Sequence, residues 1–244
     1  MDNTAYIGLS RQTALWRQLD MVSNNIANAN TPAFKNQQPM FVEYLVKTQN
    51  NERPFDDKLS FVQDLGTFRD TRDGPMTSTG NPLDLALNGP GYLVVDTDAG
   101  PMYTRGGHLR LNEAGQMVTA DGQPILSSND QPFFFAPNET QISVARDGTV
   151  TTENGQIGKL RVVRFEDEQQ LRQVSGGLYM TEQRPEEVAR PDVLQGMLEE
   201  SNVKPVVEMT RMIQLQRSYE SSSRLVEQES DRRRKVIDAL SRVA

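Results

Sequence analysis

Apolar and small side chains recur at spacings of three and four between Ser201 and Ala244. The recurring residues are Met212, Leu215, Tyr219, Ser222 and Val226. Heptad spacing of this kind places one narrow apolar stripe on one face of an α-helix. We predict a helix from about Val203 to about Leu240, roughly 57 Å long at 1.5 Å per residue. Pro205 falls in its first turn, where a missing N–H costs least, and Ser201 or Asn202 can cap its start.

A second amphipathic pattern occupies the N-terminal thirty residues. Its apolar side chains, Leu15, Leu19, Val22 and Ile26, recur at four, three and four. The pattern predicts a helix that ends before Pro32, because a proline disfavours a helical residue at the position before it. Two narrow stripes are buried most simply against each other or against copies of themselves. We therefore expect the two ends of the chain to lie together while the middle of the chain projects away.

The middle of the chain changes character twice. Residues 33–79 mix short apolar groups with polar and turn-forming residues, which indicates an extended connector with a helical turn and perhaps a strand, or else a disordered loop. From Gly80 to about residue 200, short apolar runs alternate with turn signals such as Asp121-Gly122 and Asp147-Gly148. Strands separated by turns every eight to twelve residues indicate a mostly antiparallel β-domain.

The predicted fold class is therefore α+β. Paired long N- and C-terminal helices, coiled-coil-like, accompany an extended connector and a central mostly antiparallel β-domain. The predicted boundaries are 1–32 for the N-terminal helix, 33–79 for the connector, 80–200 for the β-domain and 201–244 for the C-terminal helix.

Composition narrows the functional classes. The net charge of −7 makes nucleic acid a poor partner. With no cysteine among 244 residues, disulfides, thiolate metal sites and thiol catalysis are excluded. No apolar run approaches the length of about 18 residues that a membrane-spanning helix needs. The N-terminus lacks a signal-peptide pattern, so we expect any export to use another route.

Reactive constellations are scarce. His108 is the only histidine, so a His-pair metal site is ruled out, and we interpret it as an exposed turn residue rather than a general base. Asp96-x-Asp98-x-Gly100 begins like a calcium loop but lacks the later ligands, which favours a plain turn. The basic run from Arg232 to Lys235 points in several directions on a helix and indicates a solvated face. We therefore predict no catalytic residue, no cofactor and no metal.

Asparagines form the one unusual polar cluster, at Asn24, Asn25, Asn28 and Asn30. One interpretation is capping at the helix end, because asparagine side chains bond nearby backbone groups. The other is hydrogen bonding between packed helices. The sequence leaves both open.

Three stretches together resemble the flagellar rod and hook protein family. Ser23 to Phe34 is similar to the family's N-terminal signature, with Ala33 where the family usually has glycine. Thr79 to Tyr92, followed by Tyr103 to Gly107, resembles the start of its β-domain. Leu198 to Val203 and Gln216 to Glu220 resemble its C-terminal signature. The length and the ending of the chain favour a proximal-rod member over a distal-rod or hook-type member.

The resemblance implies a structural subunit of the hollow rod that crosses the periplasm. Implied partners are copies of itself, other proximal and distal rod subunits and the flagellar type III export apparatus, with no nucleic acid and no membrane span. The assembly interface that we predict consists of Leu15, Leu19, Val22, Asn24, Asn25, Ile26, Asn28, Met212, Leu215, Tyr219 and Val226. The alternatives are a peptidoglycan-acting enzyme that uses acidic residues and a monomeric β-domain that binds a ligand.

Overall fold

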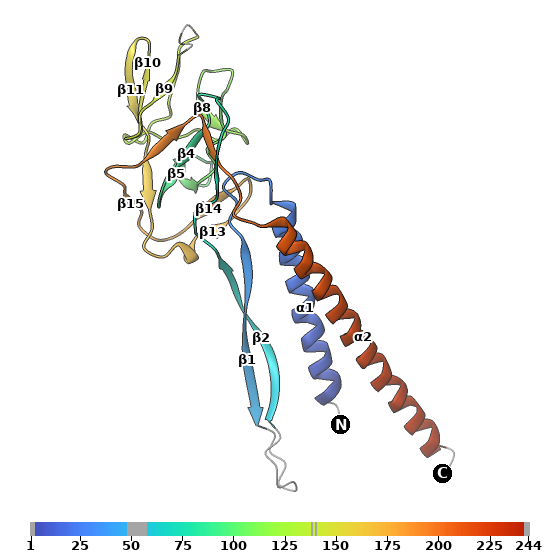
Figure 1. Cartoon of the computed structure of the whole chain (residues 1–244). Helices are drawn as coiled ribbons and strands as arrows, with labels where there is room; N and C mark the ends of the chain where they lie inside the picture. Colours follow the sequence, from blue (N-terminus) through green and yellow to red (C-terminus); the bar gives the residue numbers. More distant parts are fainter. Residues whose placement is uncertain (1–2, 48–57, 138, 140, 242–244) are drawn as a thin grey trace. The chain divides into compact units, whose positions relative to one another are not determined.

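The computed structural model in Figure 1 describes residues 3–47, 58–137, 139 and 141–241. It divides into two compact units. Unit 1 comprises Met1–Ala27, Gln37–Arg69 and Lys204–Ala244, and unit 2 comprises Asn28–Asn36 and Asp70–Val203. Each unit is thus built from segments that lie far apart in the sequence.

Both terminal helices are present in unit 1. α1 spans Asn3–Ala27 and α2 spans Pro205–Ser241, close to the ranges that the apolar periodicities predict. Pro205 is the first residue of α2, where its missing N–H is tolerated. The two residues predicted to cap α2, Ser201 and Asn202, make other hydrogen bonds. The Ser201 hydroxyl accepts a hydrogen bond from the Val203 amide, and the carbonyl of Lys204 accepts from the first amides of α2.

A long two-stranded antiparallel hairpin completes unit 1. β1 (Gln37–Lys47) pairs with β2 (Lys58–Arg69) from Gln37 opposite Arg69 to Lys47 opposite Lys58. The register shifts between Met40 and Phe41, as at a β-bulge. The sequence predicts an extended connector here, with a helical turn and perhaps a strand, whereas the described residues of this stretch form two paired strands; residues 48–57 of the predicted connector lie outside the described residues. The backbone groups of two extended runs pair with each other, which the weak alternation of their side chains does not reveal.

Unit 2 is a β-structure in which every strand pair is antiparallel. A six-stranded sheet has the order β13-β14-β6-β5-β12-β15, and smaller sheets surround it. Its elements are β3 (Met76–Ser78), β4 (Leu85–Leu87), β5 (Tyr92–Val95), β6 (Met102–Thr104), β7 (Leu109–Leu111), β8 (Met117–Thr119), β9 (Ser143–Val144), β10 (Thr149–Thr152), β11 (Gly155–Lys159), β12 (Val162–Arg164), the 3-10 turn η1 (Glu168–Gln170), β13 (Arg172–Gln173), β14 (Leu178–Met180), β15 (Glu186–Glu187), β16 (Val193–Gln195) and β17 (Met197–Glu199).

Strand β5 lies in the core and is buried on both faces. Leu93 and Val95 belong to a large aliphatic cluster, whereas Tyr92 and Val94 belong to a second cluster rich in aromatic side chains. Successive side chains of a strand point to opposite faces, so the two clusters lie on opposite sides of the sheet. The Tyr92 ring lies 5.7 Å from the Tyr179 ring, centre to centre, in an edge-on arrangement. All four residues of β5 are buried.

Turn chemistry follows the predicted pattern at two positions. Asp147-Gly148 joins β9 to β10, and Gly148 has a positive φ of 85°. The Asp96–Gly100 stretch is a turn in which the Gly100 amide donates to the Thr97 carbonyl. Within the described part of the chain, neither helix combines the length and the apolar character that crossing a bilayer requires. The predicted α+β class is confirmed.

Candidate functional site

Helices α1 and α2 pack against each other in antiparallel directions within unit 1. Three contacts fix the register: a Cβ added to Gly8 would lie 2.8 Å from Val226 Cγ2, the rings of Trp16 and Tyr219 are 6.1 Å apart, and Asn25 Nδ2 lies 3.4 Å from Glu208 Oε2. As the position on α1 rises, the position on α2 falls by a similar amount. Gly8 therefore permits a close approach of the two helices at Val226.

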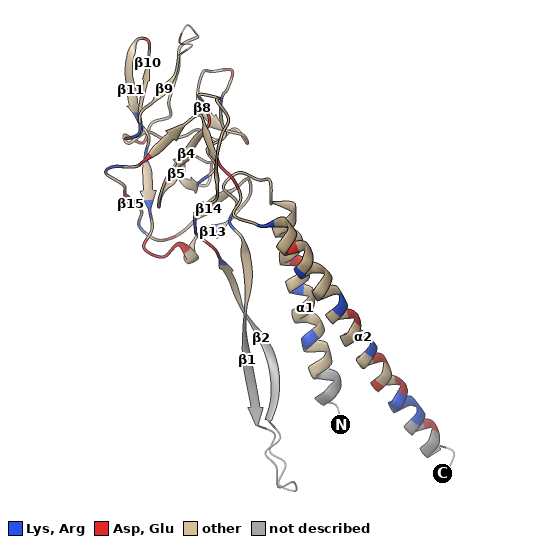
Figure 2. Cartoon of the chain, viewed as in Figure 1, with Lys and Arg blue, Asp and Glu red and all other residues tan. Residues whose placement is uncertain are grey.

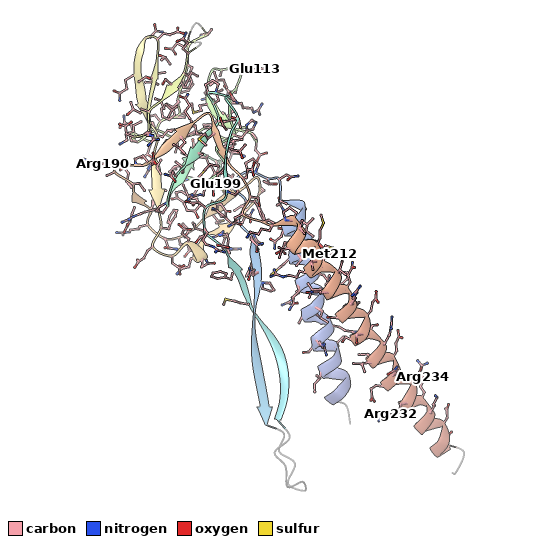
Figure 3. The ribbon with its side chains drawn as sticks, viewed as in Figure 1. Glu113, Arg190, Glu199, Met212, Arg232 and Arg234 are labelled. Atoms are coloured by element: carbon pink, nitrogen blue, oxygen red, sulfur yellow. The ribbon has the colours of Figure 1, made fainter. Side chains whose placement is uncertain are left out.

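The predicted apolar stripe of α2 is its less exposed face. Ser222 is buried, and Met212, Leu215, Tyr219 and Val226 are partly buried. Polar residues off the stripe, namely Gln214, Arg217, Glu220 and Arg224, are exposed. On α1, Val22 is buried, and Leu15, Leu19 and Ile26 are partly buried. Figure 3 shows Met212 in the N-terminal half of α2, and Figure 2 shows both signs of charge interspersed along the helix.

Asn25 is the polar centre of unit 1. Its side chain is 0% exposed and forms a two-way bond with one backbone unit: Nδ2 donates to the Gln37 carbonyl at 2.8 Å, and Oδ1 accepts from the Gln37 amide at 3.0 Å. Glu208, which is also buried, contacts the same amide group and is paired with Arg211 Nη1 at 3.1 Å. Asn25 thus joins α1 to the start of β1 and to the first turn of α2.

The remaining asparagines of the cluster behave differently. Asn24 is exposed on α1, whereas Asn28 lies in unit 2 and accepts a hydrogen bond from the Thr31 hydroxyl at 3.1 Å. The Asn28 contact is with a side chain rather than with a backbone group of the helix end, and the Asn25 contact with the partner helix is the one with Glu208. Asn25 bonds between packed elements, and Asn28 bonds locally just after the helix ends.

A second row of apolar side chains on α2 escaped the sequence analysis. Val206, Met209 and Ile213 recur at three and four and are 77%, 51% and 52% exposed. At 100° per residue this outward row lies roughly 140° around the helix from the stripe that faces α1. Leu9 and Trp16, seven residues apart on α1, are 59% and 62% exposed. The spacing of three and four between Val206, Met209 and Ile213 is visible in the sequence. The pattern is short, however, because charged residues continue the same face of the helix after Ile213.

A cluster of four charges in unit 2 was also missed. Glu199 lies at its centre, with a carboxylate that accepts from Lys35 Nζ at 2.6 Å, from Arg105 Nε at 2.7 Å and from the Gly74 amide at 2.9 Å. Arg105 also pairs with Asp73 and donates to the carbonyl of Gly91 at 3.1 Å. We call Lys35, Asp73, Arg105 and Glu199 the buried charge cluster. Figure 3 labels Glu199 among the strands of unit 2.

The cluster is balanced in charge, with two cations and two anions, and three of its side chains are at most 4% exposed. Burial by itself would raise the pKa of Glu199, but Arg105, Lys35 and the Gly74 amide outweigh it and hold that pKa below its ordinary value. Burial lowers the pKa of Lys35, and the bond to Glu199 offsets part of the effect. A buried charge of this kind is stable only while at least one partner of opposite sign compensates it.

Sequence reasoning could not have found this cluster. Adjacent carboxylates at positions 199 and 200 look alike in the sequence, yet Glu199 is 2% exposed and Glu200 is exposed. What separates them is the position of Lys35, which is 164 residues away from Glu199.

The arrangement offers little for catalysis. His108 Nδ1 lies 2.8 Å from Asp84 Oδ1, and the side chain of His108 is 56% exposed. Within the part of the chain that the structure describes, the hydrogen bond found for the His108 ring is the one with the Asp84 carboxylate, and an imidazole activates a nucleophile only when the two are hydrogen-bonded. Among the described residues, no group of three or more histidine and acidic side chains could hold a metal ion.

Comparison with known proteins supplies the family. Three family models match the chain: "Flagella basal body rod protein" over residues 6–35, "Flagellar hook protein FlgE/F/G D1 domain" over 86–152 and "Flagellar basal body rod FlgEFG protein C-terminal" over 194–239. The first covers most of α1, the second covers much of unit 2, and the third covers most of α2. The three matches therefore coincide with both terminal helices and with the β-structure.

Full-length relatives agree with the family models. The chain is 37% identical to the flagellar basal-body rod protein FlgF of Caulobacter vibrioides over 100% of both chains. It is 31% identical to FlgF of Mesorhizobium japonicum over 98% of both, and 30% identical to the rod protein FlgG of Bacillus subtilis over 93% of this chain and 94% of the relative. These matches define a structural class of protein rather than an enzyme. The chain belongs to the flagellar basal-body rod protein family.

Proposed function

We propose that this chain is a subunit of the proximal rod of the bacterial flagellum and that it self-assembles through its terminal helices. The observation that carries the proposal is the two-sided apolar character of α2 at its start. One side, from Met212 onward, faces α1 of the same chain, while Val206, Met209 and Ile213 remain exposed on another side. Large apolar side chains grouped on one exposed face are typical of interaction surfaces.

In this proposal the predicted interface residues join the two helices of one chain, and a separate set of exposed apolar residues contacts the next subunit. Leu15, Leu19 and Val22 on α1, with Leu215 and Tyr219 on α2, hold the two helices together as a coiled-coil-like pair. Because most of these side chains are only partly buried, neighbouring copies can cover what one chain leaves open. The outward row on α2, together with Leu9 and Trp16 on α1, then contacts the next subunit.

The proposed setting follows the family. Partners are other copies of the chain and the neighbouring proximal and distal rod subunits, in a rod that crosses the periplasm. The chain reaches that site through the flagellar export apparatus. Both signs of charge lie along the C-terminal half of α2, and Arg224 and Arg232 pair with Glu220 and Glu229 of the same helix. In an assembly, opposite charges on adjacent helices can also help to fix their register.

The test places a charge in the outward row. Ile213→Asp should abolish incorporation into the rod and motility, because a carboxylate in a packed apolar contact loses its hydration without gaining a partner. Gln214→Asp is the matched control, since it adds the same charge at the next, exposed position. The circular dichroism of both purified variants should match the parent. Normal motility of Ile213→Asp, with its helices intact, would refute the assembly role of the row.

A distal-rod role is the second candidate, because FlgG of Bacillus subtilis matches 93% of the chain at 30% identity. A complementation experiment distinguishes a proximal-rod role from a distal-rod role. The gene for this chain should restore swimming to a strain that lacks FlgF and should fail in a strain that lacks FlgG. The opposite outcome would assign the chain to the distal rod.

A further inference from the structure

The segment Asn28–Asn36 belongs to unit 2 although 33 residues of unit 1 separate it from the rest of that unit. It has neither helix nor strand and is held along one edge. The Ala33 amide donates to the Glu199 carbonyl at 2.8 Å, and the Asn202 amide donates to the Phe34 carbonyl at 3.2 Å. The Asn36 amide donates to the Asn202 side chain at 2.7 Å. We call Asn28–Asn36 the strap.

A hollow lies along the other edge of the strap. Residues Asn28 and Thr31 to Phe34 form one wall of a cavity of about 370 Å³. The opposite walls come from the loops and strand ends at 104–108, 119–121 and 173–179, all in unit 2. Polar side chains such as His108 and Asp121 line it, so water can enter. The lining atoms on this side forgo the contacts that a filled core would give them, although Ala33 and Phe34 are themselves only 5% exposed.

Lys35 is the strap's charged anchor. Its Nζ donates to Glu199 Oε1 at 2.6 Å and to the Arg72 carbonyl at 2.8 Å. If the strap left its place, Lys35 would carry its charge into water. Glu199 would keep Arg105 and the Gly74 amide, and the side chain of Asp73 is already 38% exposed. The carboxylate of Glu199 therefore has a cationic partner both with and without Lys35. A contact that can break and re-form reversibly needs this property.

We propose that the strap opens and closes over unit 2 as one piece, with the Lys35–Glu199 ion pair as its latch. Closure brings together residues 164 positions apart, and this contact costs less loop-closure entropy once the pairing of β17 with β3 has fixed the position of Glu199. Closure of the strap is then the last step in the folding of unit 2. In the open state the cavity walls are exposed while the sheet remains folded. The proposal stands on the geometry of unit 2 and does not depend on assembly into a rod.

A single thiol in the cavity wall reports the opening. The chain has no cysteine, and Thr119 lines the cavity and is 8% exposed, so Thr119→Cys supplies one shielded probe. In that background Lys35→Met should increase the rate of labelling by a maleimide at least about tenfold, because it removes one partner of a buried ion pair. The increased rate should depend weakly on urea, since local opening exposes little surface.

Lys159→Met is the matched control. Lys159 also lies in unit 2 and also donates to a backbone carbonyl, that of Ala189, at 3.2 Å, but it lies outside the buried charge cluster. This variant should leave the labelling rate of Thr119→Cys unchanged. Equal labelling in Lys35→Met and in the parent would overturn the proposal. So would a faster rate with the full urea dependence of global unfolding, because the sheet would then open together with the strap.

If Lys35→Met does not fold, hydrogen exchange of the unmodified chain tests the proposal instead. Hydrogen exchange should show the amides of Ala33 and Asn36 exchanging together, at least about tenfold faster than the amides of β5, as expected of a local opening. Exchange of the strap at the same rate as β5 would mean that it opens only by global unfolding, and the latch would not exist.

Discussion

Asn25 and Gln37 bond to each other in both directions, side chain to backbone, at 2.8 Å and 3.0 Å. Gln37 is the first residue of β1, and the side-chain amide of Asn25 gives its backbone the two hydrogen bonds that a further strand would otherwise supply. This pair of hydrogen bonds fixes the C-terminal end of α1 against the first residue of β1. The same side chain also lies 3.4 Å from Glu208 of α2.

The first prediction concerns this pair. Asn25→Ala should destabilise unit 1 by about 3 kcal/mol, because it leaves the amide and the carbonyl of Gln37 without their partner. Asn24→Ala is the control, since Asn24 is exposed on the same turn and should cost well under about 1 kcal/mol. Urea unfolding of the assembled state, in which α1 and α2 are expected to be ordered, measures both variants when it is followed by helical circular dichroism. Equal stability of the two variants would show that water replaces the Asn25 side chain.

The second prediction concerns Glu199 and its neighbour. Glu199→Gln removes one negative charge from between Lys35 and Arg105 and should destabilise unit 2 by about 3–5 kcal/mol. Glu200→Gln makes the same chemical change at an exposed position that accepts a hydrogen bond from the Thr77 hydroxyl, and should cost under about 1 kcal/mol. Thermal unfolding of the two variants gives the comparison, and a smaller loss for Glu199→Gln than for Glu200→Gln would contradict it.

The third prediction is a pH dependence. Because the folded-state pKa of Glu199 lies below its ordinary value of 4.5, the unfolded chain takes up the proton first. The stabilisation by Glu199 is therefore complete above about pH 5 and is lost as the pH falls through the folded-state pKa. Asp70, whose pKa is lowered chiefly by its hydrogen bond with Arg72, contributes in the same direction. The informative quantity is the difference between the parent and Glu199→Gln.

That difference in free energy of unfolding should be large at pH 7 and shrink steadily between pH 5 and the acid limit of folding. Chemical denaturation at a series of pH values supplies it. A difference that stayed constant with pH would mean that Glu199 titrates alike in the folded and unfolded chain, and its partners would then contribute nothing through charge.

The fourth prediction addresses how much of unit 2 folds by itself. A fragment of residues 80–200 contains Arg105 and Glu199 but lacks Lys35 and Asp73. It should melt cooperatively with β-type circular dichroism, because the two apolar clusters of the sheet draw on residues within that range. Its melting temperature should lie below that of a fragment of residues 28–203, which keeps the whole buried charge cluster. An unfolded 80–200 fragment would show that the strap is part of the folding core.

The sequence predicts local elements of this fold better than their long-range partners. Tyr92–Val95 reads as a buried strand because all four side chains are apolar or aromatic, and α2 follows from one heptad stripe. The pairing of β1 with β2 and the place of the strap in unit 2 depend on contacts over long sequence separations. No periodicity encodes such contacts. For the same reason Asn25 and Glu199 look like any helical asparagine and any surface acid until Gln37 and Lys35 are located in space.

The last prediction concerns the seam, by which we mean the apolar stripes along which α1 and α2 face each other. It tests whether the two helices become ordered on assembly. An isolated narrow stripe buries little area to offset a backbone ordering cost of about 1–2 kcal/mol per residue. Leu215→Asp and Ile26→Asp each place a carboxylate on a partly buried position of the seam. Both variants should fail to enter the rod, while the melting of unit 2 stays at the parental temperature. In the parent, hydrogen exchange should show weak protection of α1 and α2 in the dilute monomer and strong protection in the assembled state. Strong protection of both helices in the monomer, together with normal incorporation of Leu215→Asp, would remove the seam from the assembly mechanism and leave the outward row of α2 as the surface to test.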